Sequence, residues 1–77
     1  MLSYSLMRTD ASINMARFYI VSVQQNLFGQ YVTSRQWGRI GTRGQKQEDW
    51  FGNKMAANDA AATLLRAKVR RGYTACQ

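Results

Sequence analysis

The residue types that carry most protein catalysis are nearly missing from this 77-residue chain. It contains no histidine, and Cys76 is its single cysteine. It therefore cannot build a Ser-His-Asp or Cys-His couple, an intramolecular disulfide, or a zinc site of histidines and cysteines. Glu48, Asp49 and Asp59 fall on different predicted elements without a partner base, so they do not form a catalytic pair. We expect no catalytic residue, no metal site and no cofactor.

Basic residues dominate the charged side chains. Eleven Lys and Arg residues against four Asp and Glu residues give a formal net charge of +7. A positive field of this density attracts polyanions, with nucleic acid first and anionic membrane second. No apolar run approaches the roughly 20 residues that a membrane-spanning helix requires. We therefore expect nucleic acid, and not a membrane, as the partner.

Two arginines flank a tryptophan at alternate positions in the segment Arg35-Gln36-Trp37-Gly38-Arg39. In a strand, the three odd-numbered side chains point to the same face. The indole offers a flat surface to a sugar or an unstacked base, which contributes roughly 1–3 kcal/mol per base. Guanidinium groups bind phosphate through paired, charge-assisted hydrogen bonds. A purely structural role in the core is the alternative for Trp37.

Further basic residues extend this candidate surface. Lys68, Arg70 and Arg71 either bind the DNA backbone or complement the dipole at a helix C-terminus. Residues 38–44 are typical of a turn, with Gly38 and Gly41 as structural residues, because they match no phosphate-binding loop and lead to a strand. The full set of candidate DNA-binding residues is Trp37, Arg39, Arg35, Arg43, Lys46, Lys68, Arg70 and Arg71.

Residue patterns predict four strands followed by one helix. Alternating, β-branched and aromatic residues place the strands at 2–7, 17–24, 30–40 and 45–51, with turn-forming residues in 8–14, 25–29 and 38–44. An alanine-rich stretch predicts a helix over 54–71. Asn53 or Asn58 can cap its start, and Gly72 follows its end.

An apolar stripe indicates how the predicted helix packs. It is formed by Ala57, Ala61, Leu64, Leu65 and Val69, whose spacing places them on one side of the helix. We expect this stripe to cover one face of a four-stranded antiparallel sheet, with the other face left for water or a ligand. Trp50 is expected in the core. The fold class is α+β, and the length predicts a single domain over residues 1–77.

Several short motifs follow one another in a familiar order: residues 14–19, Leu27-Phe28-Gly29, the block 37–44 that begins Trp37-Gly38-Arg39, Leu64-Leu65, and 68–73. Together they resemble the WGR domain, with a recognisable core of about residues 2–73. This module occurs in DNA-damage-activated poly(ADP-ribose) polymerases and as small free-standing bacterial proteins, to which the chain is more similar. Asn14 lies further upstream of the second strand than the corresponding asparagine of the polymerases.

The resemblance implies a curved antiparallel sheet crossed by one helix, and binding to DNA at strand breaks near the 5′ end. It also implies that Trp37 packs on the terminal nucleotide and that Arg39 makes polar contacts at the same junction. The polymerase activity belongs to a separate catalytic domain, so the resemblance implies no enzymatic function for this chain.

We therefore expect a non-enzymatic DNA-binding module that recognises ends or breaks, 5′-phosphates included, without reading base sequence. Two alternatives stay open. Exposed strand edges and an aromatic sheet face also suit an adaptor that docks a protein or a second copy of the chain. A basic aromatic face also suits RNA or single-stranded DNA. The expected location is the cytoplasm, at the nucleoid in a bacterium.

Overall fold

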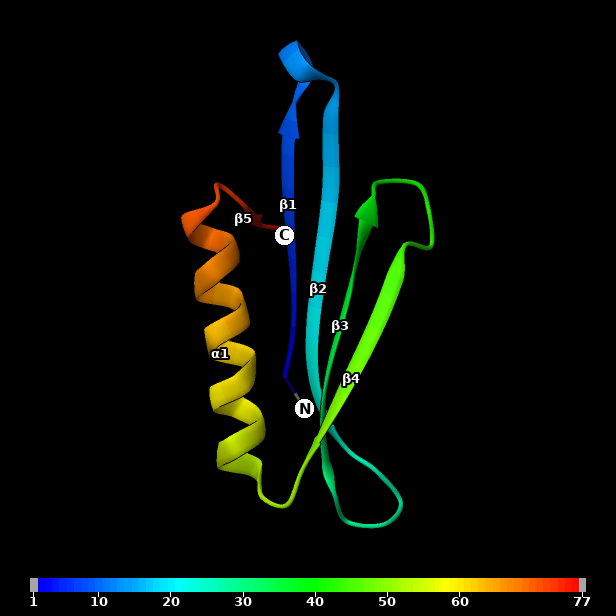
Figure 1. The fold of residues 1–77 in the computed structure, drawn as a ribbon, viewed down its shortest axis with the longest axis vertical. Helices are drawn as coiled ribbons and strands as arrows, with labels where there is room; N and C mark the ends of the chain where they lie inside the picture. Colours follow the sequence, from blue (N-terminus) through cyan, green and yellow to red (C-terminus); the bar gives the residue numbers. More distant parts are fainter. Residues whose placement is uncertain (1, 77) are drawn as a thin grey trace.

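Five antiparallel strands and one helix form the structure, a computed structural model that describes residues 2–76 (Figure 1). Met1 and Gln77, the ends of the predicted domain, lie outside the described residues. In chain order the elements are β1 (Leu2–Asp10), the 3-10 helix η1 (Ala11–Ile13), β2 (Met15–Gln25), β3 (Tyr31–Arg39), β4 (Gln45–Phe51), α1 (Lys54–Arg70) and β5 (Thr74–Ala75).

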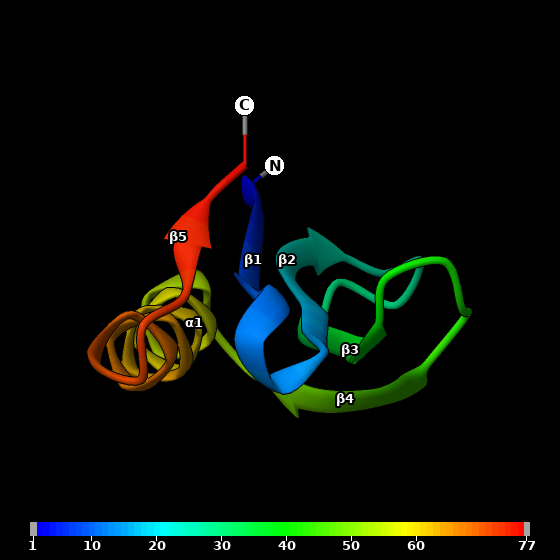
Figure 2. The same ribbon diagram turned by 90° about the horizontal axis from the view of Figure 1, so that it is seen from above.

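The strands form one sheet in the order β4-β3-β2-β1-β5, which curves without closing (Figure 2). All neighbouring strands are antiparallel, and α1 lies against one face. The predicted fold class, a curved antiparallel sheet with one C-terminal helix, is therefore confirmed. Over residues 2–76, the structure contains no helix that is both long and apolar enough to span a membrane.

The β1–β2 hairpin is longer than predicted. The strand that was expected to end at Met7 continues to Asp10, so the loop predicted over residues 8–14 shrinks to η1 and Asn14. The Asp10 carboxylate accepts hydrogen bonds from the Ser12 amide at 3.1 Å and the Ser12 hydroxyl at 2.6 Å. Asn14 closes the turn in the left-handed region with φ 53°, a conformation that asparagine tolerates. Residues 8–10, which the sequence predicts to form a turn, thus belong to a strand because they pair with residues 15–17 of β2.

The helix begins at the predicted residue, Lys54, and ends at Arg70, one residue before the predicted end. Asn53 is the residue that caps its start. The Asn53 side chain accepts a hydrogen bond from the Ala56 amide at 2.8 Å. At the other end, the Gly72 amide donates to Val69 and the Tyr73 amide donates to Lys68, at 3.0 and 3.1 Å. These two bonds form a Schellman motif, which requires positive φ at the glycine; φ is +94°.

The short strand β5 was not predicted. After the Schellman motif, Thr74 and Ala75 pair with Met7 and Leu6 on the outer edge of β1. The Cys76 amide adds a bond to the Ser5 carbonyl at 2.8 Å. A two-residue strand is too short to show any periodicity, so its position depends on where the helix ends.

The core lies between α1 and the sheet. Ala57 and Ala61 bring the helix backbone close to β2 and β3, and the Thr33 hydroxyl donates to the Ala57 carbonyl at 2.8 Å. Val69, predicted to belong to the apolar stripe, is 57% exposed, because the neighbouring Lys68 occupies the space beside the sheet. The buried apolar side chains of this core cluster are Leu6, Tyr19, Val21, Val23, Ala57, Ala61 and Tyr73.

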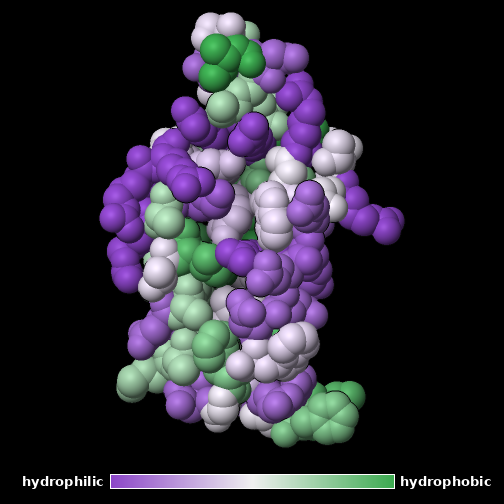
Figure 3. Space-filling model, viewed as in Figure 1, coloured by the Kyte–Doolittle hydropathy of each residue, from purple (hydrophilic) through white to green (hydrophobic). Residues whose placement is uncertain are grey.

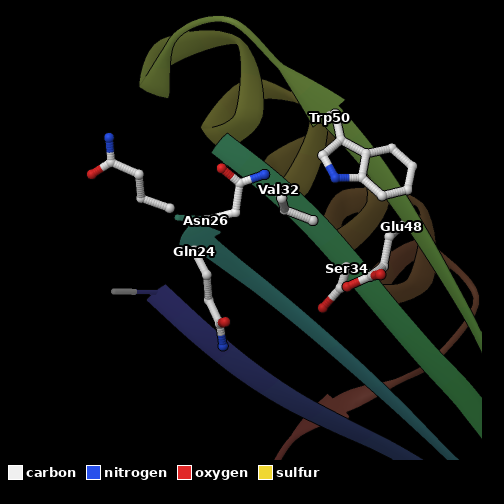
Figure 4. Close-up of a pocket in the computed structure, with 7 residues that line it drawn as sticks. Gln24, Asn26, Val32, Ser34, Glu48 and Trp50 are labelled. Atoms are coloured by element: carbon white, nitrogen blue, oxygen red, sulfur yellow. The ribbon is translucent and has the colours of Figure 1, made fainter. Parts of the chain in front are cut away.

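The prediction that Trp50 belongs to the core is wrong. β4 pairs with β3 so that Trp50 lies opposite Val32, and both side chains point to the face that α1 does not cover. There Trp50 is 58% exposed. It borders a shallow hollow of about 220 Å³ together with Gln24, Asn26, Ser34 and Glu48 (Figure 4).

Candidate nucleic-acid interface

Trp37 lies on the helix side of the sheet. It pairs across the strands with Tyr19, and Arg35 pairs with Val21. Because Tyr19 and Val21 are buried in the core under α1, Trp37 and Arg35 must share that face. The expectation that the helix-free face carries the ligand surface is therefore wrong for Trp37. The helix ends at this level of the sheet, so the indole is only half-buried.

Two hollows meet at the Trp37 ring. One, of about 250 Å³, is lined by Tyr19, Arg35, Trp37, Gln47 and Lys68. The other, of about 500 Å³, is lined by Arg17, Trp37, Gly38, Arg39, Lys68 and Tyr73. The inner part of the indole packs against the core. Its remaining surface borders both hollows and is open to a ligand.

Arg35 is positioned by the tryptophan that it flanks. Its guanidinium carbon lies 5.5 Å from the centroid of the Trp37 ring, a distance at which a cation is attracted to the aromatic face. Its Nη2 donates to the Gln47 side chain at 2.8 Å. Its Nε is buried and has no hydrogen-bond partner.

Arg39 is held by the turn that precedes β2. Its Nη1 donates to the Asn14 carbonyl at 3.1 Å and its Nη2 donates to Oδ1 of Asn14 at 3.2 Å. A guanidinium has five N–H donors, so this clamp orients the group and leaves three donors available. Arg39 itself is exposed.

Lys68 extends from the last turn of α1 over two tyrosines. Its ammonium lies 4.7 Å from the Tyr19 ring centroid and 5.3 Å from that of Tyr73. The two rings pack edge to face, with centroids 6.3 Å apart. Burial lowers the pKa of Lys68, and repulsion from Arg71, Arg17 and Arg35 lowers it further. The positive charges here are therefore close enough to oppose one another.

Arg8 and Arg17 also belong to this surface, although they were not among the predicted site residues. Arg8 pairs with Arg17, and Arg17 pairs with Arg39, which makes a row of three arginines across β1, β2 and β3. Arg8 also lies beside Gly72, where an added Cβ would come within 3.4 Å of its Nε. This row lies next to the row formed by Leu6, Tyr19 and Trp37, on the same face of the sheet. The sequence shows that each arginine is two residues from one of these core residues, but it does not show the strand register that aligns the three arginines.

We call Arg8, Arg17, Arg35, Arg39, Lys68 and Arg71 the cationic cluster. Between Leu2 and Cys76, the only ion pair in the structure joins Lys46 to Glu48 at 3.9 Å, so no member of the cluster forms an ion pair with a carboxylate there. The carbonyl end of α1 adds only about half a negative charge nearby. In Figure 3, hydrophilic side chains gather around the C-terminal end of α1 and the adjoining sheet. This arrangement suits a polyanion.

A comparison with protein families decides the relationship of the chain. The family model of the WGR domain matches residues 3–77. The chain belongs to the WGR domain family. The predicted resemblance is thereby confirmed, and WGR domains are nucleic-acid-binding modules.

One relative of this WGR chain is an uncharacterized protein, y4dW, of Sinorhizobium fredii (strain NBRC 101917 / NGR234). The two are 48% identical over 66 residues, which cover 86% of the present chain and 32% of the relative. The chain therefore spans about a third of the length of that protein.

The glycines of the WGR segment shape the turn that follows Trp37. A Cβ on Gly38 would lie 2.7 Å from the Cα of Gly44, and a Cβ on Gly44 would collide with the Trp37 carbonyl. The backbone that approaches Gly38 closely is therefore that of Gly44 in the same chain. Gly41, with φ +94°, completes the turn between β3 and β4.

Three of the predicted DNA-binding residues of this WGR domain lie away from the cationic cluster. Lys46 is on the face that α1 does not cover, because it pairs with Gln36. Arg43 is exposed in the β3–β4 turn, where its carbonyl accepts a hydrogen bond from Gln36 at 2.6 Å. Arg70 borders a separate, largely apolar hollow on the exposed side of α1, with Leu65, Arg66 and Val69. The structure thus brings together Trp37, Arg35, Arg39, Lys68 and Arg71 from the predicted set.

Proposed function

We propose that this WGR domain is a non-enzymatic DNA-binding module that engages duplex ends or breaks through the cationic cluster and Trp37. The observation that carries the proposal is the cluster itself. Arg17, Arg35, Arg39 and Lys68 line the two hollows at a half-buried indole where α1 ends, and Arg8 and Arg71 extend the positive charge beyond them. Membership in the WGR family supports nucleic acid as the ligand. Binding to ends, and the absence of base-sequence readout, are our extension of that assignment.

The cations of the cluster are suited to contact phosphates. Arg8, Arg17 and Arg39 follow one another across three neighbouring strands, about 5 Å apart at the backbone. Their guanidinium groups offer paired donors to successive phosphate oxygens. Contacts to phosphate position a protein on DNA without carrying sequence information. A module that relies on them binds many sequences with similar affinity.

The position of Trp37 favours an end over continuous duplex. The outer face of a base pair is open for stacking only where the helix stops or is broken. The indole lies in a recess between the end of α1 and the sheet, bordered by Arg39 and Lys68. A terminal nucleotide can enter this recess, whereas bases stacked inside a duplex cannot. Its 5′-phosphate would lie near Arg17 and Arg39.

A binding titration at several salt concentrations tests the electrostatic part of the proposal. A short fluorescently labelled duplex is titrated with the protein, and anisotropy gives the affinity. Each phosphate contact should contribute a slope of about −0.9 to the dependence of log K on log salt. An affinity that does not change with salt would contradict the proposal.

Substitution of the indole tests end recognition. Trp37→Ala should weaken binding to a linear duplex about ten-fold or more, from the lost stacking, and change binding to a duplex closed by hairpins at both ends much less. Arg70→Ala is the matched control, because it removes a cation outside the cluster and should weaken both ligands alike. Circular dichroism melting confirms that the variants are folded. Equal loss on both ligands with Trp37→Ala would contradict end recognition, and tighter binding to single strands would favour the alternative ligand.

A further inference from the structure

The strand β4 forms one edge of the sheet and has no partner on its outer side. Within the described chain it pairs only with β3, and Gln45 through Trp50 are exposed along it. The whole sequence contains no proline, so nothing in β4 removes a backbone donor. An unprotected edge of this length is a template for another strand.

We propose that a second copy of this chain pairs with this edge, so that β4 lies antiparallel to β4 about a twofold axis at Gln47. The charges of the strand support this occupant. In that register Lys46 lies directly opposite the partner's Glu48, and Glu48 lies opposite the partner's Lys46. Two cross-strand ion pairs then form where opposite charges on facing positions stabilise a sheet.

Neighbouring registers are less favourable. A twofold axis perpendicular to the sheet requires that two facing residues have residue numbers that are both odd or both even. Only then do the same residues of the two copies point to the same face of the sheet. Moving the axis to Lys46 places two lysines opposite each other, and moving it to Glu48 places two glutamates together. Directly opposed like charges are destabilising. The pattern Lys46-Gln47-Glu48 therefore selects the axis at Gln47.

The exposed Trp50 fits the same arrangement. With the axis at Gln47, Trp50 lies next to the partner's Gly44, the turn residue just before its β4, on the face that α1 leaves free. An aromatic side chain can cover a glycine across a strand pair, which would shield an indole that is 58% exposed in the single chain. On the other edge, Leu2–Tyr4 of β1 carries no charge that could select a register. At the far end of β1, the Asp10 carboxylate is already bonded to Ser12.

The twofold axis has a consequence that depends on the proposed function, although the dimer itself does not. Both copies of α1 and Trp37 would face the same side of a continuous sheet. Trp37 pairs with Gln45, and in this register Gln45 faces the partner's Asp49, four residues from the partner's Gln45. The two indoles would therefore be about four residues apart along the strands. Across the sheet they would be three strand spacings apart. The resulting separation is about 20 Å. Two DNA ends could then be held side by side.

Charge reversal gives a direct test of the dimer in the absence of DNA. Sedimentation equilibrium should show association of the unmodified protein to twice the chain mass as its concentration rises. Lys46→Glu and Glu48→Lys should each raise the dissociation constant about ten-fold or more, since each opposes like charges. An equal mixture of the two variants should restore dimers, because every glutamate then meets a lysine. Val69→Ser, on the exposed side of α1, should have no effect.

Cross-linking tests the register. In a Cys76→Ser background, Gln47→Cys should form an intermolecular disulfide on mild oxidation, because the residue faces its own copy on the axis. Asp49→Cys should not, since its copy lies about 14 Å away along the strand and disulfides need Cα atoms within about 7 Å. A protein that is monomeric at every concentration, or a dimer insensitive to both charge reversals, would overturn the proposal. Failure of DNA binding would leave these results unchanged.

Discussion

Arg35 and Arg39 flank the same tryptophan, yet their side chains are held in different ways. Arg35 stacks on the Trp37 ring and bonds to Gln47, so it helps to orient the indole. Arg39 is clamped by Asn14 and keeps three free donors. We therefore propose that Arg39 binds phosphate and that Arg35 supports the indole. The left-handed turn before β2 thus acts on a residue 25 positions later.

Loosening the clamp should weaken DNA binding without unfolding the protein. Asn14→Gly keeps a residue that accepts positive φ but removes the Oδ1 acceptor of Arg39. The lost hydrogen bond orients the Arg39 guanidinium before DNA binds, so affinity for a linear duplex should fall several-fold. Anisotropy measures it at fixed salt. An unchanged affinity together with a strong effect of Arg39→Gln would show that the clamp has no role.

Lys68 should give DNA binding a pH dependence above neutrality. Burial and then the neighbouring arginines lower its pKa below the ordinary 10.5, so the folded protein releases this proton before the unfolded chain does. The contribution of Lys68 to the free energy of unfolding therefore rises with pH between the lowered pKa and 10.5. A bound phosphate has the opposite effect and raises the pKa. Affinity should consequently fall as pH rises through the lowered pKa.

The measurement is a series of duplex titrations from neutral pH up to the onset of alkaline duplex melting. Lys68→Arg is the matched variant, because it keeps the positive charge but does not titrate in this range. It should remove the pH dependence while retaining most of the affinity. A fall in affinity that is the same for both proteins would contradict a role for Lys68.

Among the elements, α1 determines where the interface lies. Its Ala57 and Ala61 face sets how closely it packs on the sheet, and the Schellman motif ends it beside Tyr19. Lys68, whose ammonium lies over the Tyr19 and Tyr73 rings, belongs to the last helical turn that this motif closes. The motif at Gly72 therefore helps to position the candidate site.

Replacing the glycine of this motif should destabilise the domain. Gly72→Ala places a Cβ at φ +94°, close to Arg8, and should lower the free energy of unfolding by about 1–2 kcal/mol. Gly52→Ala is the matched control, because an added Cβ there meets nothing within 4 Å. Urea unfolding followed by circular dichroism compares the two variants. Equal stability would contradict the importance of the C-terminal cap.

Sequence patterns predict most of the elements but not how they face one another. Alternation identifies the strands, and Asn53 and Gly72 delimit the helix, because these signals are local. The extension of β1 through Arg8 and Asp10, and the strand β5, depend on pairing with residues far away in sequence. The same holds for Trp50, whose exposure follows from its register with β3. Long-range register is the information that a single sequence lacks.

In the candidate site, too, the sequence predicts what is local to one strand but not what depends on strand register. Arg35, Trp37 and Arg39 could be grouped because they alternate within one strand. Arg8 and Arg17 could not be added, since their position beside Arg39 results from two strand pairings. Lys46 was predicted to bind DNA because of its charge, yet it pairs with Gln36 and therefore lies on the face of the sheet that α1 does not cover. Side-chain direction within a strand is predictable, whereas the face that each strand presents to the helix is not.

At the scale of the whole molecule, the most exposed apolar side chains, Leu27 and Phe28, lie at the opposite end of the sheet from the cationic cluster. The cationic cluster occupies the sheet beside the end of α1. The uncharged loop between β2 and β3 projects Leu27 and Phe28 into solvent, and Figure 3 shows an apolar protrusion at this end of the molecule. Asn26 stabilises this loop by accepting hydrogen bonds from the amides of Phe28 and Gln30. A polyanion is therefore expected to approach the molecule at the cluster and not at this loop.

The most direct test of this account is a map of amide chemical shifts on addition of a short 5′-phosphorylated duplex. We predict shifts concentrated at Arg17, Trp37, Arg39 and Lys68, with the resonances of Trp50 and Phe28 unchanged. The same duplex closed by hairpins at both ends should produce a weaker response at the Trp37 indole. Shifts centred on Trp50 and the helix-free face, with Trp37 unaffected, would contradict it.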